Sequence, residues 1–244
     1  MKKIIFTGLI LAFAAQLNLV QAQVWDRQFT AELFRLDEEI KRNELGVDFE
    51  DPTMYTGSPY SHPSYLMGKI YKDNELLADD VALRYNVMAD ELEVKRTLAS
   101  PMSDARMLTK SPDIYVKIAE DIFVFVPYKG GVEGGGYFEV LYEGTNIDLF
   151  KKHMKDFTPA KPATTSITRP VPAKFADEPV YYLVTKAGKF YEMPNSRSKK
   201  LKVFGSNKDL IKDYVKDNGL DLNNQADLER TVRYYDNELS KDSE

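Results

Sequence analysis

The chain has no cysteine among its 244 residues. This absence excludes disulfide bonds, thiol nucleophiles and thiolate zinc sites, and it also excludes the lipid-bearing cysteine of a bacterial lipoprotein. Histidine is almost as scarce, because only His62 and His153 are present. Neither has a histidine partner at metal-ligand spacing, so we expect no transition-metal site and no cofactor.

Catalytic motifs are missing as well. The sequence has no Gly-x-Ser-x-Gly turn of a serine hydrolase. The glycine-rich segment 130–136 lacks the Gly-Lys-Ser/Thr ending of a phosphate-binding loop, and it precedes a strand pattern instead of a helix. A calcium loop starting at Asp217 fails, because Gly219 and Leu228 stand where oxygen ligands are needed. We therefore expect a protein that is not an enzyme, although its many acidic residues leave open a carboxylate-based hydrolase.

Positive charge is in short supply in the first part of the chain. The net charge is −5, and residues 1–150 hold 15 Lys and Arg against 24 Asp and Glu. Residues 151–244 hold 18 against 14. Nucleic-acid binding needs a dense basic face, so we expect no nucleic-acid partner. The acidic body and mildly basic tail are compatible with an oriented interaction with another protein, and equally with ordinary solvated faces.

The N-terminus has the pattern of a secretory signal peptide. Lys2 and Lys3 precede an apolar run over residues 4–15, and Val20-Gln21-Ala22 provides a cleavage site. We expect cleavage after Ala22 and a mature chain that begins at Gln23. No later apolar run reaches the roughly 20 residues of a membrane-spanning helix. The predicted location is the periplasm, or the periplasmic or outer face of the outer membrane of a bacterium.

Residue periodicity predicts an α+β fold. We expect an antiparallel β-meander, barrel-like or sandwich-like, with a short N-terminal helix and a C-terminal helical pair. The predicted organisation is a signal peptide (1–22), an N-terminal helix and β-rich body (23–155), a Pro-rich linker or loop (156–175), and a β-hairpin with a helical tail (176–244). Whether the Pro-rich stretch separates two domains is left open.

Apolar spacing and turn residues locate the individual elements. The short N-terminal helix is indicated by apolar residues at helical spacing over 29–40. Predicted strands cover 65–72, 76–87, 91–98, 114–119, 122–128, 136–142, 147–152, 180–185 and 189–193. Predicted helical segments cover 196–204, a stretch that begins at Ser206 with Asp209 as a capping pair, and 225–239.

Tyrosine is abundant, with 15 residues, and many of them lie beside predicted turns. Tyrosine combines an apolar ring with a polar tip, which suits partner-binding surfaces, although sheet and helix packing uses it equally. The candidate partner-binding residues are five of the tyrosines and three lysines of the tail: Tyr55, Tyr60, Tyr65, Lys199, Lys200, Lys202, Tyr234 and Tyr235.

Several strings of the tail are typical of one group of proteins. They are Tyr181-Tyr182-Leu183, Lys199-Lys200-Leu201, Ile211-Lys212-Asp213-Tyr214-Val215-Lys216, Asn218-Gly219-Leu220 and Tyr234-Tyr235-Asp236, together with Leu83-Arg84-Tyr85-Asn86 in the body. On these residues the chain resembles a family of uncharacterised exported proteins from Bacteroidetes. The resemblance implies a bacterial envelope location and brings no activity or catalytic residues.

The sequence thus predicts an exported, non-enzymatic envelope protein that acts as an interaction or accessory module for an envelope or outer-membrane protein. Two alternatives stay open. One is a small-ligand or carbohydrate-binding protein whose meander closes into a barrel or sandwich. The other is the carboxylate-based hydrolase.

Overall fold

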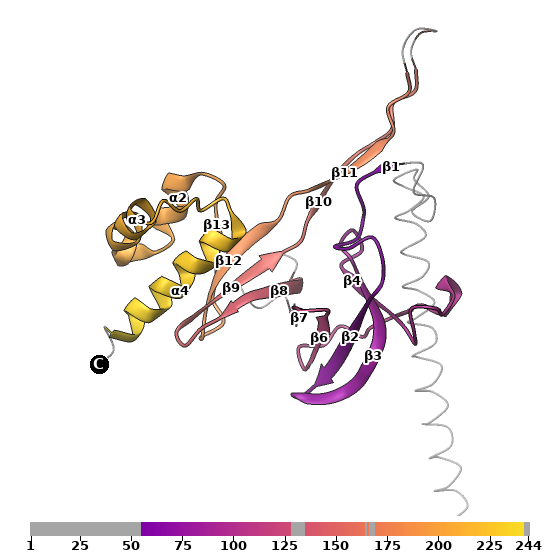
Figure 1. The fold of residues 1–244 in the computed structure, drawn as a ribbon, viewed down its shortest axis with the longest axis horizontal. Coiled ribbons are helices and arrows are strands. Elements are labelled where there is room, and N and C mark those ends of the chain that lie inside the picture. The colour runs from indigo at the N-terminus through magenta and orange to yellow at the C-terminus, as the bar shows by residue number, and fades with distance from the viewer. Residues whose placement is uncertain (1–54, 128–134, 164, 166–168, 242–244) are drawn as a thin grey trace, which may run out of the picture. The chain divides into compact units, whose positions relative to one another are not determined.

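The computed structural model describes residues 55–127, 135–163, 165 and 169–241 (Figure 1). The predicted signal peptide, the predicted helix over 29–40 and most of the glycine-rich segment lie outside the described residues. The described part belongs to one compact unit, Tyr55–Glu244.

The main element is a ten-stranded antiparallel sheet in the order β13-β12-β9-β8-β7-β6-β2-β3-β4-β5. Its strands are β2 (Leu66–Lys72), β3 (Glu75–Asn86), β4 (Glu91–Lys95), β5 (Arg106–Met107), β6 (Ile114–Ile118), β7 (Asp121–Val126), β8 (Gly136–Glu143), β9 (Ile147–Lys152), β12 (Val180–Thr185) and β13 (Phe190–Met193). Most neighbours in the sheet are also neighbours along the chain, as short turns between alternating segments predict. The predicted antiparallel meander is confirmed. The described strands form an open sheet with β13 and β5 at its ends, not a closed barrel.

The stretch 156–175, predicted as a Pro-rich linker or loop, includes residues of two strands that pair with each other. β10 (Lys155–Thr158) and β11 (Ala173–Asp177) are antiparallel, and β1 (Tyr55–Thr56) adds to β11 in parallel. A further bridge joins Lys161 and Val171 through two backbone hydrogen bonds of 2.9 Å. The strand β10 directly follows β9, and β11 directly precedes β12, so this ribbon continues the β9–β12 pair.

The helical tail follows β13. It comprises α2 (Arg197–Lys202), a 3₁₀ turn η3 (Gly205–Asn207), α3 (Lys208–Asp217) and α4 (Gln225–Lys241); a second 3₁₀ turn, η1 (Met102–Asp104), lies in the body. Gly219, with φ of +63°, ends the α3 segment in the left-handed conformation that glycine adopts without strain. The predicted Ser206–Asp209 cap is not formed, because Ser206 lies in η3 and the helix begins at Lys208. The predicted α+β class with C-terminal helices is confirmed.

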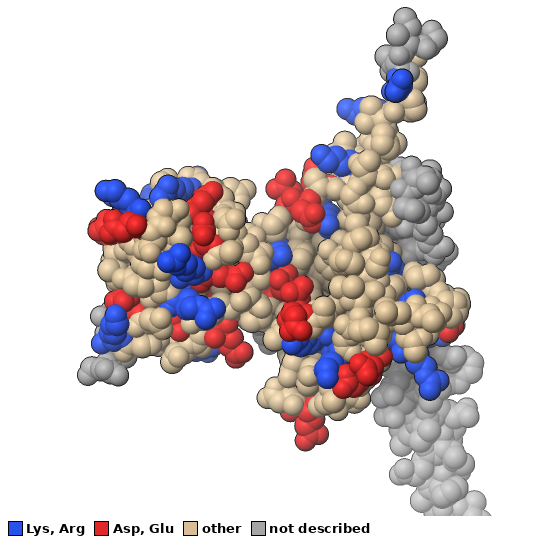
Figure 2. All heavy atoms as spheres, viewed as in Figure 1, with Lys and Arg blue, Asp and Glu red and all other residues tan. Residues whose placement is uncertain are grey.

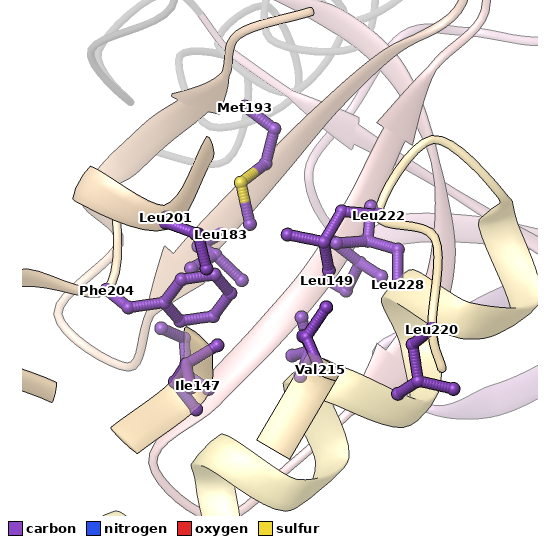
Figure 3. Packing of buried hydrophobic residues seen from close by; sticks show 12 residues of the cluster. Ile147, Leu149, Leu183, Met193, Leu201, Phe204, Val215, Leu220, Leu222 and Leu228 are labelled. Atoms are coloured by element: carbon purple, nitrogen blue, oxygen red, sulfur yellow. The ribbon is translucent and has the colours of Figure 1, made fainter. Parts of the chain in front are cut away.

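The helices bury their apolar sides against one face of the sheet (Figure 1). In β9 and β12, alternate residues Leu149 and Leu183 point into this core. Figure 3 shows their side chains meeting Phe204 and Val215 from the tail. The whole core consists of Ile147, Leu149, Leu183, Met193, Leu201, Phe204, Ile211, Val215, Leu220, Leu222, Leu228 and Val232. Packing of an amphipathic helical pair on a sheet face is therefore what stabilises the tail.

A second core lies within the body, where the sheet curls. It contains Ile70, Leu83, Tyr85, Val87, Leu92, Val116, Ile118, Phe123 and Tyr137. Asp90, in the turn between β3 and β4, connects distant strands of this curved part of the sheet. Its carboxylate accepts hydrogen bonds from the Tyr85 hydroxyl (2.6 Å), the Tyr137 backbone N–H (3.1 Å) and the Lys152 ammonium (2.8 Å). The β3–β4 turn is thereby tied to β8 and β9.

One carboxylate joins the tail to the sheet. Asp236 of α4 is buried and accepts backbone N–H bonds from Thr145, Asn146 and Ile147 at the β8–β9 turn. The turn approaches so closely that a Cβ at Gly144 would lie 2.6 Å from the Asp236 Oδ2 atom. Glycine is therefore required at this turn position by the close approach of the helix.

Candidate functional site

Tyr60 and Tyr65, two of the predicted partner-binding residues, pack around a buried arginine. The Arg84 guanidinium carbon lies 3.5 Å from the centre of the Tyr60 ring and 4.3 Å from that of Tyr65. Arg84 also forms an ion pair with Glu93 at 2.7 Å, and the Tyr65 hydroxyl donates to the same carboxylate at 2.6 Å. Burial, followed by the hydrogen bond to Glu93, raises the pKa of the Tyr65 hydroxyl far above its usual value. Both rings therefore complete an internal cation–π and hydrogen-bond cluster.

Tyr55 lies in a different place from these two tyrosines. Its ring packs edge-on against Phe175 at 5.3 Å, and Phe175 in turn contacts Phe157 at 4.9 Å. The three rings hold the base of the β1–β11–β10 ribbon. Tyr55 thus belongs to a different packing cluster from Tyr60 and Tyr65, although the sequence predicted the same role for all three.

The three predicted lysines of α2 also differ in their surroundings. Lys199 and Lys202 are exposed, whereas Lys200 is buried and 4% accessible. The Lys200 ammonium donates to the backbone carbonyl of Leu222 (2.9 Å) and to Asn223 Oδ1 (2.8 Å). Burial lowers the pKa of the Lys200 ammonium. This residue connects α2 to the α3–α4 turn.

We expect Lys200→Ala to lower the free energy of unfolding by about 1–3 kcal/mol, because the buried carbonyl of Leu222 loses its donor. The neighbouring exposed substitution Lys199→Ala should change it by less than about 0.5 kcal/mol. Urea denaturation of both variants, followed by circular dichroism, measures the difference. Equal effects would show that Lys200 is not a structural connector.

The two tyrosines of α4 point to separate neighbours. Tyr234 stacks in parallel on Tyr214 of α3, with ring centres 3.8 Å apart. Tyr235 meets Phe204 edge-on at 5.1 Å, and burial raises the pKa of its hydroxyl. The Tyr214–Tyr234 stack and Tyr235 are all half-buried, and all three tyrosines pack against the core of the tail.

Positive charge gathers on the helical tail. Residues 196–216 contain seven Lys and Arg but only two Asp, and within the described residues none of these seven cations forms an ion pair. Figure 2 shows Lys and Arg side chains at the surface of the tail. By contrast, cations of the body are frequently paired, as Lys152 is with Asp90 and Lys151 with Glu139. Residues 196–216 of the tail therefore carry positive charge that no ion pair within the described residues neutralises, whereas residues 217–241 hold six Asp and Glu against three Lys and Arg.

The predicted lysines are only part of this charge. Arg197, Lys208, Lys212 and Lys216 also contribute to it and are not among the predicted partner-binding residues. Spacing offered a signal for three of them, because Lys208, Lys212 and Lys216 recur every four residues and so share one side of α3.

Glu139 is the buried acid of β8, and the nearby Asp121 of β7 has a pKa raised by burial and by the charge of Glu139. The Glu139 carboxylate is engaged by His153 and by the Lys151 ammonium. Burial alone would raise the pKa of Glu139, but the His153 hydrogen bond and the Lys151 charge outweigh it, and the pKa lies below its usual value. A general acid needs a raised pKa instead, so Glu139 does not support the hydrolase alternative.

The described residues offer neither a metal site nor a membrane-spanning helix. They contain no group of three or more His, Cys, Asp and Glu side chains placed to hold a metal ion. None of their helices combines the length and apolar character needed to cross a bilayer.

No protein-family model matches the chain, and neither curated proteins nor solved structures give a significant match. The resemblance to exported Bacteroidetes proteins therefore stays a prediction.

Proposed function

We propose that this chain is an exported, non-enzymatic protein of the bacterial cell envelope that acts as an interaction module for another envelope or outer-membrane protein. The observation that carries the proposal is the unneutralised positive charge of the helical tail. Opposite charges across an interface steer association and fix its orientation. The partner surface that fits is therefore acidic.

The contact surface that we propose consists of Lys199, Lys202 and the Tyr214–Tyr234 stack. Both lysines are exposed, and the stacked rings are half-buried. Partly exposed aromatic rings next to cations are common in protein interfaces, where tyrosine supplies contact area at a low entropic cost. Tyr60, Lys200 and Tyr235 are left out of the surface because they serve internal packing.

Crosslinking of the tagged full-length protein in its native envelope, followed by mass spectrometry, tests this function. The wild-type protein should fractionate with the envelope and capture one reproducible envelope protein. The charge reversal Lys199→Glu/Lys202→Glu should reduce this capture at least tenfold, because two attractive contacts become repulsive. The matched control Lys72→Glu/Arg96→Glu reverses two exposed cations of the body and should leave the capture unchanged.

Two results would count against the proposal. One is recovery of the protein outside the envelope fraction. The other is equal loss of capture in the control variant, which would show that overall charge matters and the tail surface does not.

A further inference from the structure

A shallow pocket of about 490 Å³ lies on the helical tail, apart from the proposed contact surface. It is lined by Ser196, Arg197, Ser198, Leu201, Lys212 and Lys216. Lys199 lies on the opposite side of α2 from the lining residues Arg197 and Leu201, as helical spacing dictates. A ligand in this pocket and a protein that contacts Lys199 would therefore meet different side chains, whereas Lys202 lies one helical turn after the lining residue Ser198.

The lining has one sign of charge. Arg197 comes from α2, whereas Lys212 and Lys216 lie one turn apart on α3. No carboxylate lines the pocket, and within the described residues none of these three cations forms an ion pair. The acids Asp209, Asp213 and Asp217 on the same helix are exposed and stand outside the lining. Three like charges around one hollow repel one another, and a bound anion would relieve this repulsion.

The remaining lining residues supply hydrogen-bonding groups and an apolar wall. The Ser196 and Ser198 hydroxyls lie 3.2 Å apart, and Ser196 makes no side-chain capping bond to the helix. These two hydroxyls hydrogen-bond to each other, so one donates to the other and one remains free to donate to an oxygen atom in the pocket. Leu201 is buried and contributes the apolar part.

We propose that this pocket binds the phosphoryl group of an organic phosphate. A phosphate monoester carries nearly two negative charges and three acceptor oxygens at neutral pH. The planar Arg197 guanidinium suits bidentate binding of such an oxyanion, and the two lysines act as point charges. A single carboxylate has only two oxygens, so it would accept hydrogen bonds from fewer of the donor groups on Arg197, the two lysines and the serines. The pocket is large enough to hold carbon atoms next to Leu201 as well as the phosphoryl group.

Isothermal titration of the full-length mature protein with glycerol 3-phosphate tests the site, with sodium acetate as the anion control. Saturable binding of the phosphate should be at least tenfold tighter than that of acetate. Lys212→Gln/Lys216→Gln should weaken it at least tenfold, whereas Lys199→Gln/Lys202→Gln should change it less than twofold. Arg197→Lys should retain part of the affinity and Arg197→Gln less. Thermal unfolding of each variant confirms that it is folded.

The absence of saturable binding, or an equal loss in both lysine pairs, overturns the proposal. Co-sedimentation with phosphatidylcholine vesicles containing 30% phosphatidic acid, against pure phosphatidylcholine, identifies the source of the phosphoryl group. Binding to these vesicles that requires Lys212 and Lys216 assigns the site to a lipid headgroup. Binding to glycerol 3-phosphate alone assigns it to a soluble ester. The inference does not rest on the proposed protein partner, whose capture is tested by substitutions at other residues.

Discussion

Replacing Asp236 with alanine should destabilise the protein by about 3–5 kcal/mol, among the largest effects expected of any single substitution here. The carboxylate accepts bonds from the N–H groups of Thr145 (2.8 Å), Asn146 (2.7 Å) and Ile147 (3.0 Å), and from the Tyr142 hydroxyl (3.0 Å). Hydrogen bonds to a charged acceptor are stronger than neutral ones, and the substitution would leave several donors without it. Urea denaturation followed by circular dichroism measures the loss.

The exposed neighbour Asn237 provides the matched control, because Asn237→Ala should change stability by less than about 0.5 kcal/mol. The pH dependence gives a second readout. Burial alone would raise the pKa of Asp236, but the backbone N–H groups of Thr145 and Asn146 and the Tyr142 hydroxyl outweigh it, so the pKa is lowered. The resulting stabilisation is present above the unfolded-state pKa, about 4, and is lost as the pH falls through the lower folded-state value. Wild type should therefore lose stability on acidification more steeply than Asp236→Asn. Parallel pH profiles would contradict this role.

Glu93→Ala should destabilise the protein by about 3–5 kcal/mol, because it leaves Arg84 charged and buried without its carboxylate. Arg84 and Glu93 are 8% and 4% accessible, and Arg84 donates to Glu93 Oε2 from Nε (3.0 Å) and a terminal nitrogen (2.7 Å). Burial alone would lower the pKa of Arg84, but the charge and hydrogen bond of Glu93, together with the nearby tyrosines, outweigh it and the pKa is raised. The Tyr65 hydroxyl also loses its acceptor.

A double substitution separates the unpaired charge from the loss of packing. Arg84→Met/Glu93→Leu removes both charges, keeps most of the volume, and should recover the greater part of the lost stability. Glu75→Ala, which removes an exposed glutamate from the neighbouring strand β3, serves as the control. Chemical denaturation of the single, double and control variants checks the set. A double variant as unstable as Glu93→Ala would show that shape, and not an unpaired charge, causes the loss.

Local patterns predicted most strands of the main sheet and the helices of the tail, but they did not predict β1, β5, β10 or β11. Alternation over 65–72 and 114–119 corresponds to β2 and β6, and the apolar spacing of Leu228 and Val232 corresponds to the buried side of α4. These signals are local because side-chain direction repeats every two residues in a strand and every 3.6 in a helix. The sequence did not predict that the sheet stays open, because closure of a sheet into a barrel depends on its curvature and on whether its two edge strands pair with each other.

Local patterns did not predict which of the candidate residues are buried. Lys199 and Lys200 are adjacent and chemically identical in the sequence, yet one is exposed and the other is buried beneath the α3–α4 turn. The sequence offers Tyr60 and Tyr65 as surface tyrosines, but in the structure both rings pack against the guanidinium group of Arg84 from β3. Neither outcome is encoded in residue type or spacing, because each depends on a partner supplied by packing.

The sequence by itself determined the antiparallel order of most strands, the amphipathic helices of the tail and its excess of positive charge. Each follows from residue periodicity, short turns or composition within a few tens of residues. Only the tertiary structure decided that Asp236 holds a turn some 90 residues earlier, and that Arg197, Lys212 and Lys216 share one pocket. The physical reason is that these contacts arise from the packing of α2, α3 and α4 against one another and on the sheet, where apolar burial fixes positions that no local pattern specifies.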